Sequence, residues 1–388
     1  MVRMFRISSI YPWDNKPMEE KVNTSFYQRA GLTKFARIFS KSDGCNTRAT
    51  SLRSAPSSCW NDRRLFRVPW EDIPAPALSA KSNFDISNIS DVRHLVDGSN
   101  SGLYIGYYKD NDVVIKMIKP KKSSSESILK EFDAEFEILR RVRHPNIIKV
   151  IGKGDSPRTF VVLEWLGGGD LATMARDLTG TRNRPLRNFI PLRLLRYLQN
   201  LGGAIHYLHE EFHPNACIIH RDLKPENVGF TENGKLKLLD FGLSTCVKKR
   251  SFSTEVYNMT GYTGSPRYMA PEVFLHKPYN EKVDVYSFGI MTWEIVSSKV
   301  AFEGFSLSEF RDRIIMNGER PPIDPRWPPA FQSLLQSCWN TDYEARPSFA
   351  QILLVLEGLV PFTTSHSVVD MSVILASLTG KSLKQVFT

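Results

Sequence analysis

One segment of the chain, residues 219–242, carries side chains of the kinds that phosphoryl chemistry needs. It reads I-H-R-D-L-K-P-E-N-V-G-F-T-E-N-G-K-L-K-L-L-D-F-G and combines Asp222 and Asp240 with Asn227 and Lys224. Transfer of a phosphoryl group from ATP needs a carboxylate that orients a hydroxyl and accepts its proton, oxygen ligands for Mg²⁺, and positive charge beside the phosphate. The residue types in this segment match that set.

A single H-R-D or D-F-G triplet is an accident of three letters, and an aspartate after a strand is usually a turn or helix-cap residue. Here H-R-D-L-K-P-E-N is followed by D-F-G after an apolar strand. This combination resembles the signature of the protein kinases. The resemblance implies that Asp222 is the catalytic base, that Asn227 and Asp240 bind Mg²⁺, and that Lys224 supplies the charge.

The remaining parts of such a site must come from elements far away in the sequence. Residues 113–118 form a β-branched strand that contains Lys116, in V-V-I-K, and a lysine inside a buried strand is costly unless it is paired. Its partner should be a glutamate of the helix predicted over residues 127–142 by the spacing of its apolar residues. Three glutamates compete for this role, Glu131, Glu135 and Glu137. The interval to His144-Pro145-Asn146 that is usual in the family favours Glu135, and Glu137 is then a solvated helix residue.

The segment before this strand, residues 97–106, is an imperfect glycine-rich loop. Compared with G-x-G-x-x-G-x-V, Val96 and Ser101 replace glycines and Gly98 keeps one. Alone it would indicate an ordinary hairpin turn. Because this loop is in register with Lys116, the resemblance assigns ATP contacts to Val96, Gly98, Ser99 and Leu103.

Residues 160–163 form another apolar strand, and the sequence E-W-L-G-G-G follows it. The resemblance makes residues 164–169 the hinge whose backbone holds adenine, with contacts from Leu163, Glu164 and Leu166. Asp170 takes a ribose hydroxyl or caps a helix, and the sequence does not separate these. Val114 stands above the adenine where the family has Ala, and Gly229 stands below it where the family has a bulky aliphatic residue. We hypothesise that the adenine slot is shifted, because the two changes partly offset each other in volume.

The segment after Gly242, up to residue 270, is rich in hydroxyl groups. It is either a surface loop that is merely rich in Ser and Thr or a switch that a phosphate orders by binding an arginine. We favour the switch, with Arg221 as the receptor and Thr260 and Thr263 ahead of the other hydroxyls. The resemblance places Ser265 in contact with Asp222 and Lys224, and pairs Glu272 with Arg346.

The composition excludes several classes of protein. The chain of 388 residues carries a net charge of +10, and residues 1–83 hold 14 Lys and Arg but 7 Asp and Glu. Five scattered cysteines without zinc-ligand spacing indicate reduced thiols and a cytoplasmic location. No apolar stretch predicts a spanning helix or a signal core.

Residues 1–83 lack the sustained spacing of apolar residues that predicts a helix or a strand, so we expect disorder there. A solvated basic tail is favoured over membrane or nucleic-acid contact. An organelle-targeting peptide is also conceivable, although early acidic residues argue against it.

The resemblance covers residues 92–360 and is greatest to the tyrosine-kinase-like group, because of Y-M-A-P-E, D-V-Y-S-F-G and C-W…R-P-S-F. Lys224, two residues after Asp222, is the serine/threonine form. The resemblance implies an α+β bilobal fold and phosphorylation of protein hydroxyls with ATP and Mg²⁺, or Mn²⁺, with an upstream kinase as a conceivable partner. The alternatives are an inactive pseudokinase scaffold and, without a supporting motif, a nucleic-acid-binding protein. The expected domains are a basic region 1–83, a kinase domain 84–360 and a tail 361–388, and the kinase domain divides into an N-lobe 84–163, a hinge 164–169 and a C-lobe 170–360.

Overall fold

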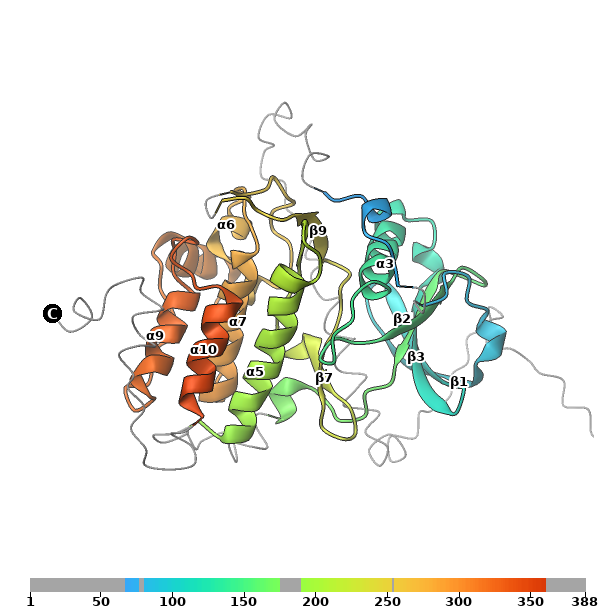
Figure 1. The fold of residues 1–388 in the computed structure, drawn as a ribbon, viewed down its shortest axis with the longest axis horizontal. Helices are drawn as coiled ribbons and strands as arrows, with labels where there is room; N and C mark the ends of the chain where they lie inside the picture. Colours follow the sequence, from blue (N-terminus) through green and yellow to red (C-terminus); the bar gives the residue numbers. More distant parts are fainter. Residues whose placement is uncertain (1–66, 77–79, 175–189, 253–254, 361–388) are drawn as a thin grey trace, which may run out of the picture.

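A computed structural model of the chain describes residues 67–76, 80–174, 190–252 and 255–360. These residues form two lobes, one built on a β-sheet and one mainly helical (Figure 1). The α+β bilobal fold expected from the sequence is therefore confirmed.

The small lobe is built on a five-stranded antiparallel sheet with the strand order β1-β2-β3-β5-β4. Its strands are β1 (Ser90–Asp97), β2 (Ser101–Tyr108), β3 (Asn111–Ile118), β4 (Val150–Gly154) and β5 (Phe160–Glu164). Strand β3 is central and its apolar residues are fully buried, which explains its unbroken β-branched run. Helix α3 (Glu126–Leu139) follows the short 3-10 turn η4 (Pro120–Lys122) and packs its apolar face on the sheet.

The large lobe is a set of packed helices, in which α10 lies beside α5 and α9, and α9 lies beside α7 (Figure 1). Its main helices are α5 (Leu192–His206), α7 (Lys282–Ser297), α9 (Pro329–Cys338) and α10 (Phe349–Leu359). Short helical pieces complete it: the π-helical turns η5 (Tyr207–Glu211) and η8 (Phe310–Met316), the helices α6 (Pro271–Phe274) and α8 (Leu307–Glu309), and the 3-10 turn η7 (Pro266–Tyr268). Helix α7 is buried on all sides, because its sequence is apolar around its whole circumference.

Two small antiparallel pairs lie between the sheet and these helices and carry the chemistry-bearing loops. Strand β6 (Ala216–Ile219) pairs with β9 (Thr245–Lys248), and β7 (Val228–Phe230) pairs with β8 (Leu236–Leu238). The 3-10 turn η6 (Pro225–Asn227) leads into β7. The loops after β6 and β8 therefore emerge close together.

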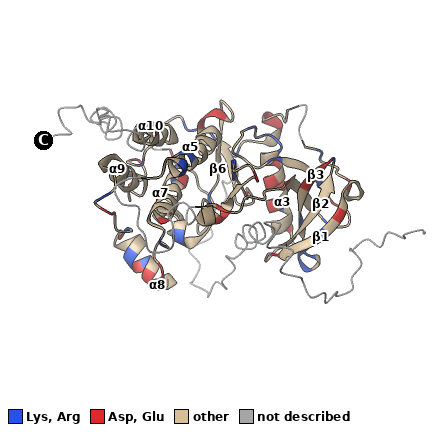
Figure 2. Cartoon of the chain, turned by 90° about the horizontal axis from the view of Figure 1, so that it is seen from below, with Lys and Arg blue, Asp and Glu red and all other residues tan. Residues whose placement is uncertain are grey.

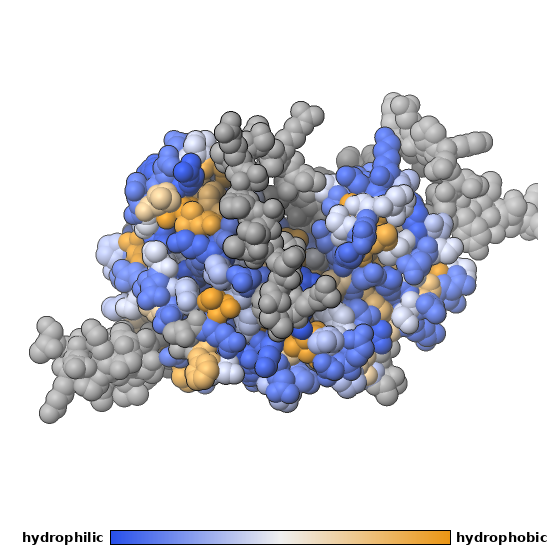
Figure 3. Space-filling view, turned by 90° about the horizontal axis from the view of Figure 1, so that it is seen from above, coloured by the Kyte–Doolittle hydropathy of each residue, from blue (hydrophilic) through white to orange (hydrophobic). Residues whose placement is uncertain are grey.

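The main apolar core is continuous across both lobes, from Leu103 and Val114 in the small lobe to Leu359 in the large one. Acidic and basic residues are interspersed along the ribbons of both lobes (Figure 2). The face seen in Figure 3 is mostly hydrophilic, with small separate apolar patches. Among the described helices, none combines the length and apolar character that crossing a membrane requires.

The chain before residue 84 differs from the expected disorder where the structure describes it. The 3-10 turns η2 (Trp70–Asp72) and η3 (Ile86–Asn88) flank the predicted boundary, and Ile73 is only 3% exposed. The backbone N–H of Lys153 donates to the carbonyl of Lys81 over 2.9 Å, so this segment also extends the sheet edge at β4. A few apolar anchors suffice to fix a polar segment against an existing core. The predictions for residues 1–66 and for the tail 361–388 lie outside the described residues.

Candidate active site

Lys116 of β3 lies between carboxylates from two other elements. Its Nζ is 2.9 Å from Glu135 Oε2 of α3 and 3.3 Å from Asp240 Oδ1, which follows β8. The side chains of Lys116 and Glu135 are 7% and 1% exposed. Of the three glutamates that competed for this role, the structure thus brings Glu135 to Lys116. The predicted solvated residue Glu137 instead pairs with Arg140 and Arg141.

The electrostatics of this cluster keep Asp240 ionised. Burial alone would raise the pKa of Asp240, but the ammonium groups of Lys116 and Lys224, together with His220, outweigh it and lower this pKa to about 2. The backbone of Asp240 has a φ of 58°, in the left-handed region that non-glycine residues rarely adopt. Such strain is usual at functional positions that the surrounding fold holds in place.

A second cluster surrounds Asp222 in the loop after β6. Its Oδ2 accepts hydrogen bonds from Lys224 Nζ at 2.6 Å and from Asn227 Nδ2 at 3.0 Å, and its Oδ1 accepts one from the backbone N–H of Ser265 at 2.8 Å. Lys224 also donates to Ser265 Oγ at 2.9 Å. The predicted neighbours of Asp222 are therefore all in contact with it or with each other.

The side-chain oxygen of Asn227 has no protein partner among the described residues. The amide nitrogen of Asn227 donates to Asp222, so Asn227 Oδ1 points away from Asp222. This buried oxygen accepts no hydrogen bond from the described residues. Buried polar atoms are nearly always paired, so an orphan oxygen is a feature to explain. An amide oxygen together with the Asp240 carboxylate is a ligand set that suits Mg²⁺, which takes its further ligands from phosphates and water. The two residues fit the predicted metal.

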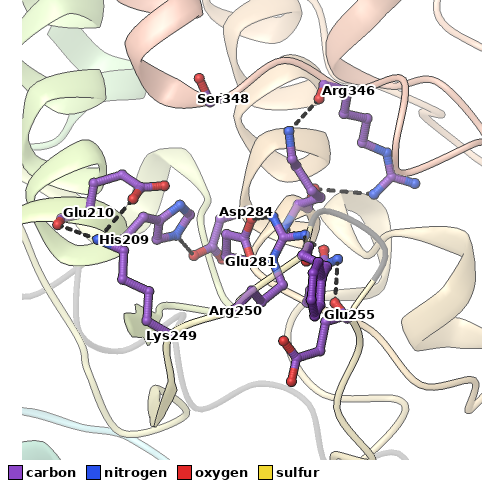
Figure 4. A network of polar contacts seen from close by, with 12 residues as sticks. His209, Glu210, Lys249, Arg250, Glu255, Glu281, Asp284, Arg346 and Ser348 are labelled. Atoms are coloured by element: carbon purple, nitrogen blue, oxygen red, sulfur yellow. Dashed lines mark hydrogen bonds and ion pairs between the residues drawn. The ribbon is translucent and has the colours of Figure 1, made fainter. Parts of the chain in front are cut away.

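The first turn of helix α7 holds the loop that carries Asp222 through Asp284, which Figure 4 shows beside His209. The Asp284 carboxylate accepts hydrogen bonds from the backbone N–H groups of His220 and Arg221, each over 2.8 Å, and lies 2.9 Å from His209 Nε2. Burial raises the pKa of Asp284, but the His209 hydrogen bond and the nearby histidines and N–H groups outweigh it and lower the pKa. The sequence did not indicate this role of Asp284. A lone carboxylate in the apolar run K-V-D-V-Y-S-F-G could have indicated it, because a buried charge needs partners.

The residues predicted to surround adenine share one face of the sheet. In the strand register Leu103 lies opposite Lys116, Val96 opposite Leu103, and Val114 opposite Leu163. Directly paired residues point to the same side of a sheet, and successive residues at a spacing of two do so as well. All four apolar residues contact the core on the Lys116 side. The structure thus brings this set together.

The hinge residues Trp165 to Gly169 connect β5 to the large lobe, and the backbone N–H and C=O of Leu166 have no hydrogen-bond partner among the described residues. Gly168 is needed for close approach, because a Cβ there would lie 2.4 Å from the carbonyl oxygen of Thr231. Gly229 is buried in β7 beside Asp170.

Two predicted ATP contacts have other local partners. The Asp170 carboxylate accepts a hydrogen bond from the backbone N–H of Thr173 over 2.7 Å, so of its two alternatives the structure shows the helix cap. The backbone N–H of Gly98 donates to the carbonyl of Ser101 over 2.8 Å, which closes a tight hairpin turn that contains Ser99. The carbonyl of Asn100 at its tip accepts from Lys119.

The Glu164 side chain belongs to an ion pair that the sequence did not indicate. Its Oε1 lies 2.6 Å from Lys237 Nζ of β8 and accepts the backbone N–H of Lys149 at 2.7 Å. Its contribution to a nucleotide site would therefore come from the backbone. The pair connects the end of β5 to the large lobe.

The segment after Asp240 runs along β6 and returns to the loop that carries Asp222. Arg221 Nη1 donates to Thr260 Oγ1 over 3.1 Å, and Thr260 is exposed. Thr263 Oγ1 donates instead to the carbonyl of Thr260 over 2.9 Å. Farther along, Arg346 binds the Glu272 carboxylate with both of its terminal nitrogens, as the resemblance implied.

Comparison with known proteins places these features in a family context. A family model described as protein tyrosine and serine/threonine kinase matches residues 89–356. Over 292 residues, or 73% of this chain, the sequence is 33% identical to the serine/threonine-protein kinase VIK of Arabidopsis thaliana and covers 64% of it. It is 32% identical to the kinase STY17 of the same plant over 71% of this chain and 45% of STY17. It is 31% identical to the serine/threonine/tyrosine-protein kinase HT1 over 70% of this chain and 67% of HT1. The chain thus spans less than two thirds of VIK and STY17.

Proposed function

Because the chain belongs to the protein tyrosine and serine/threonine kinase family, we propose that it transfers the γ-phosphoryl group of ATP to serine and threonine hydroxyls of proteins. One observation carries this proposal. Lys116 bridges Glu135 and Asp240, so residues from three distant parts of the chain converge at one point. That arrangement retains the polar groups that phosphoryl transfer needs, which an inactive scaffold would have no use for.

The reaction assigns a task to each of these side chains. Lys116 would hold the α- and β-phosphates of ATP, and Glu135 fixes its position. The substrate hydroxyl would donate a hydrogen bond to Asp222, attack the γ-phosphorus and give up its proton to this carboxylate, while ADP leaves. Lys224 contacts both Asp222 and Ser265, so it can place its charge beside the transferred phosphoryl group.

Asn227 Oδ1 and the Asp240 carboxylate would hold Mg²⁺, or Mn²⁺, which neutralises charge on the phosphates. Val96, Leu103, Val114 and Leu163 offer the apolar surface for adenine, and the backbone of Glu164 and Leu166 offers the polar edge. Gly98 and Ser99 at the hairpin tip, Asp170 beside the ribose and Gly229 at the floor remain proposals.

The proposal is tested by phosphate transfer from radiolabelled ATP to a basic protein such as histone. We expect incorporation with Mg²⁺ or Mn²⁺, and phosphoamino acid analysis should give phosphoserine and phosphothreonine. The variants Asp222→Asn and Asp240→Asn are nearly isosteric and should lose at least about a thousandfold in rate. An inactive wild-type protein with both metals would refute the enzyme, and mainly phosphotyrosine would refute the specificity.

We further propose that phosphorylation of Thr260 regulates this activity. Its exposed hydroxyl already accepts a hydrogen bond from Arg221, the residue before Asp222. A phosphate there would pair with this guanidinium and fix the catalytic loop. Activity of the phosphorylated protein should fall in Thr260→Ala but not in Thr263→Ala, since the Thr263 hydroxyl does not contact Arg221 among the hydrogen bonds of the described residues. Equal activity of both variants and the wild type would dismiss the switch.

A cytoplasmic location is also part of the proposal. Cys217, Cys246 and Cys338 are free and buried, although Cys217 and Cys246 lie on neighbouring strands. Burial raises the pKa of Cys246 to about 12, so it is a protonated thiol. Reduced thiols are typical of the cytosol.

A further inference from the structure

The segment Arg67–Ile73, here called the N-terminal strap, precedes the part of the chain that matches the kinase family. That match begins at residue 89. In Figure 1 the strap, in dark blue, crosses the end of α3 and runs toward β9. Its anchors are Val68 and Trp70, which pack partly buried against the main core, and Ile73, which is 3% exposed within it.

One residue at the end of α3 holds the strap. Arg141 Nε donates to the carbonyl of Ile73 over 2.5 Å, and Nη2 donates to the carbonyl of Trp70 over 3.0 Å. Its guanidinium carbon lies 4.9 Å from the centre of the Trp70 ring. Nη1 donates back to the carbonyl of Glu137 over 3.0 Å, so Arg141 binds the last turn of α3 and the strap at once. An arginine with an 8% exposed side chain and an aromatic ring beneath it is a firm attachment.

The other end of the strap reaches the strand that follows Asp240. Arg67 forms an antiparallel β-bridge with Val247 of β9. The strap is therefore connected through Arg141 to the last turn of α3, the helix that carries Glu135, and through Val247 to the segment that begins at Asp240. Glu135 and Asp240 are the carboxylates that hold Lys116.

We propose that the N-terminal strap is a positioning element that keeps Glu135 and Asp240 together on Lys116. Trp70 and Arg141 act through the Lys116–Glu135 pair and touch no reacting atom. The apolar face of α3 packs on the sheet, and the strap adds an attachment just after the last turn of the helix, through Arg141. The effect on catalysis rests on the proposed kinase activity, whereas the effect on α3 does not.

The substitution that tests this is Trp70→Ala, which removes the ring under Arg141 at a partly exposed site. We expect kcat/KM to fall roughly tenfold, within the usual range for coupling between sites. Trp70→Phe keeps a ring and should recover most of the rate. Ile86→Ala serves as the matched control, because Ile86 precedes the same domain but packs against the separate cluster around Phe84; it should leave the rate unchanged.

A double-mutant cycle separates positioning from general stability. If Trp70 acts through Glu135, Trp70→Ala should cost little more once Glu135→Gln is present, whereas a merely structural loss would multiply with it. Additive effects, or a Trp70→Ala variant as active as the wild type, would overturn the proposal.

Amide hydrogen exchange provides a readout that needs no catalysis. In Trp70→Ala we expect faster exchange in residues 126–139 and unchanged exchange in α7 and α10. Equal acceleration throughout, or none in α3, would overturn the strap's role. A wild-type protein without activity would refute the proposed function but would leave this exchange test intact.

Discussion

The buried pair of Arg346 and Glu272 allows a stability prediction whose size follows from the geometry. Arg346 Nη1 and Nη2 bind the two carboxylate oxygens of Glu272 at 2.6 and 2.9 Å, and the side chains are 0% and 8% exposed. Arg346 also donates to the carbonyls of Asn340 and Lys282 and lies over the ring of Tyr286. It thus connects the segment before α10 to α6 and α7.

The two single substitutions leave different groups unpaired. Glu272→Gln keeps one acceptor oxygen for Arg346 and removes the opposite charge, so we expect a loss of about 2 kcal/mol in the free energy of unfolding. Arg346→Met leaves a buried carboxylate and two carbonyls without donors, so we expect about 4 kcal/mol. With about 2–4 °C per kcal/mol for a domain of this size, Tm should fall by roughly 4–8 °C and 8–16 °C.

The informative variant is the double substitution Glu272→Gln, Arg346→Met. It buries no unpaired charge, so its loss should be smaller than the sum of the two single losses by about 1–3 kcal/mol. Urea denaturation of the four proteins at pH 7, with equal m values, measures this. Strict additivity, or a larger loss for Glu272→Gln than for Arg346→Met, would show that the loss does not come from the buried groups that each substitution leaves unpaired.

Three further predictions concern the proposed adenine site and the loop that carries Asp222. Val114→Ala and Gly229→Leu should each raise the KM for ATP, and together they should raise it less than the product of the two effects, which ATP titration checks; independent effects would contradict a shifted slot. Ser265→Ala should lower kcat about tenfold because Lys224 loses an acceptor, whereas Ser265→Thr should keep the rate; equal rates for both in steady-state assays would count against this contact. The folded-state pKa of Asp284 is lowered, so its stabilisation is present above the unfolded pKa of about 4 and is lost as the pH falls through the folded value. Urea denaturation from pH 5 to 2 should therefore show a smaller loss for Asp284→Asn than for the wild type, and equal losses would contradict it.

The side chains of the candidate site could be placed from the sequence because each lies in a short segment with its own strong signal. Asp222, Asn227 and Asp240 lie in one segment, and Lys116 interrupts a β-branched run where a charge is costly. The register of such strands follows from their burial, since a shift by one residue would turn Lys116 to the other face. The choice of Glu135 depended on the family interval, because helix periodicity alone left three glutamates.

The contacts that the sequence did not indicate join parts of the chain whose separation carries no local signal. Lys237 is an ordinary basic residue of a short strand until the fold brings it to Glu164. Trp70 lies in a segment with too few apolar residues to fold alone, and the existing core, Arg141 and the bridge to Val247 fix it. The composition of a segment indicates how much entropy is lost when it becomes ordered. It does not show which surface of the fold the segment will pack against.

The position of Glu135 beside Lys116 also depends on packing that lies outside the ion pair. The ion pair between Lys116 and Glu135 cannot itself hold α3 on the sheet, since burying both charges costs about as much as their attraction returns. The attachment must come from the apolar face of the helix, where Phe132 and Phe136 are 4% and 1% exposed in the core that both lobes share. Lys116 Nζ also lies 5.6 Å from the centre of the Phe132 ring, so the aromatic face contributes to both packing and charge. The position of Glu135, and with it the competence of Lys116, is therefore set by packing around α3 more than by the charges that carry the chemistry.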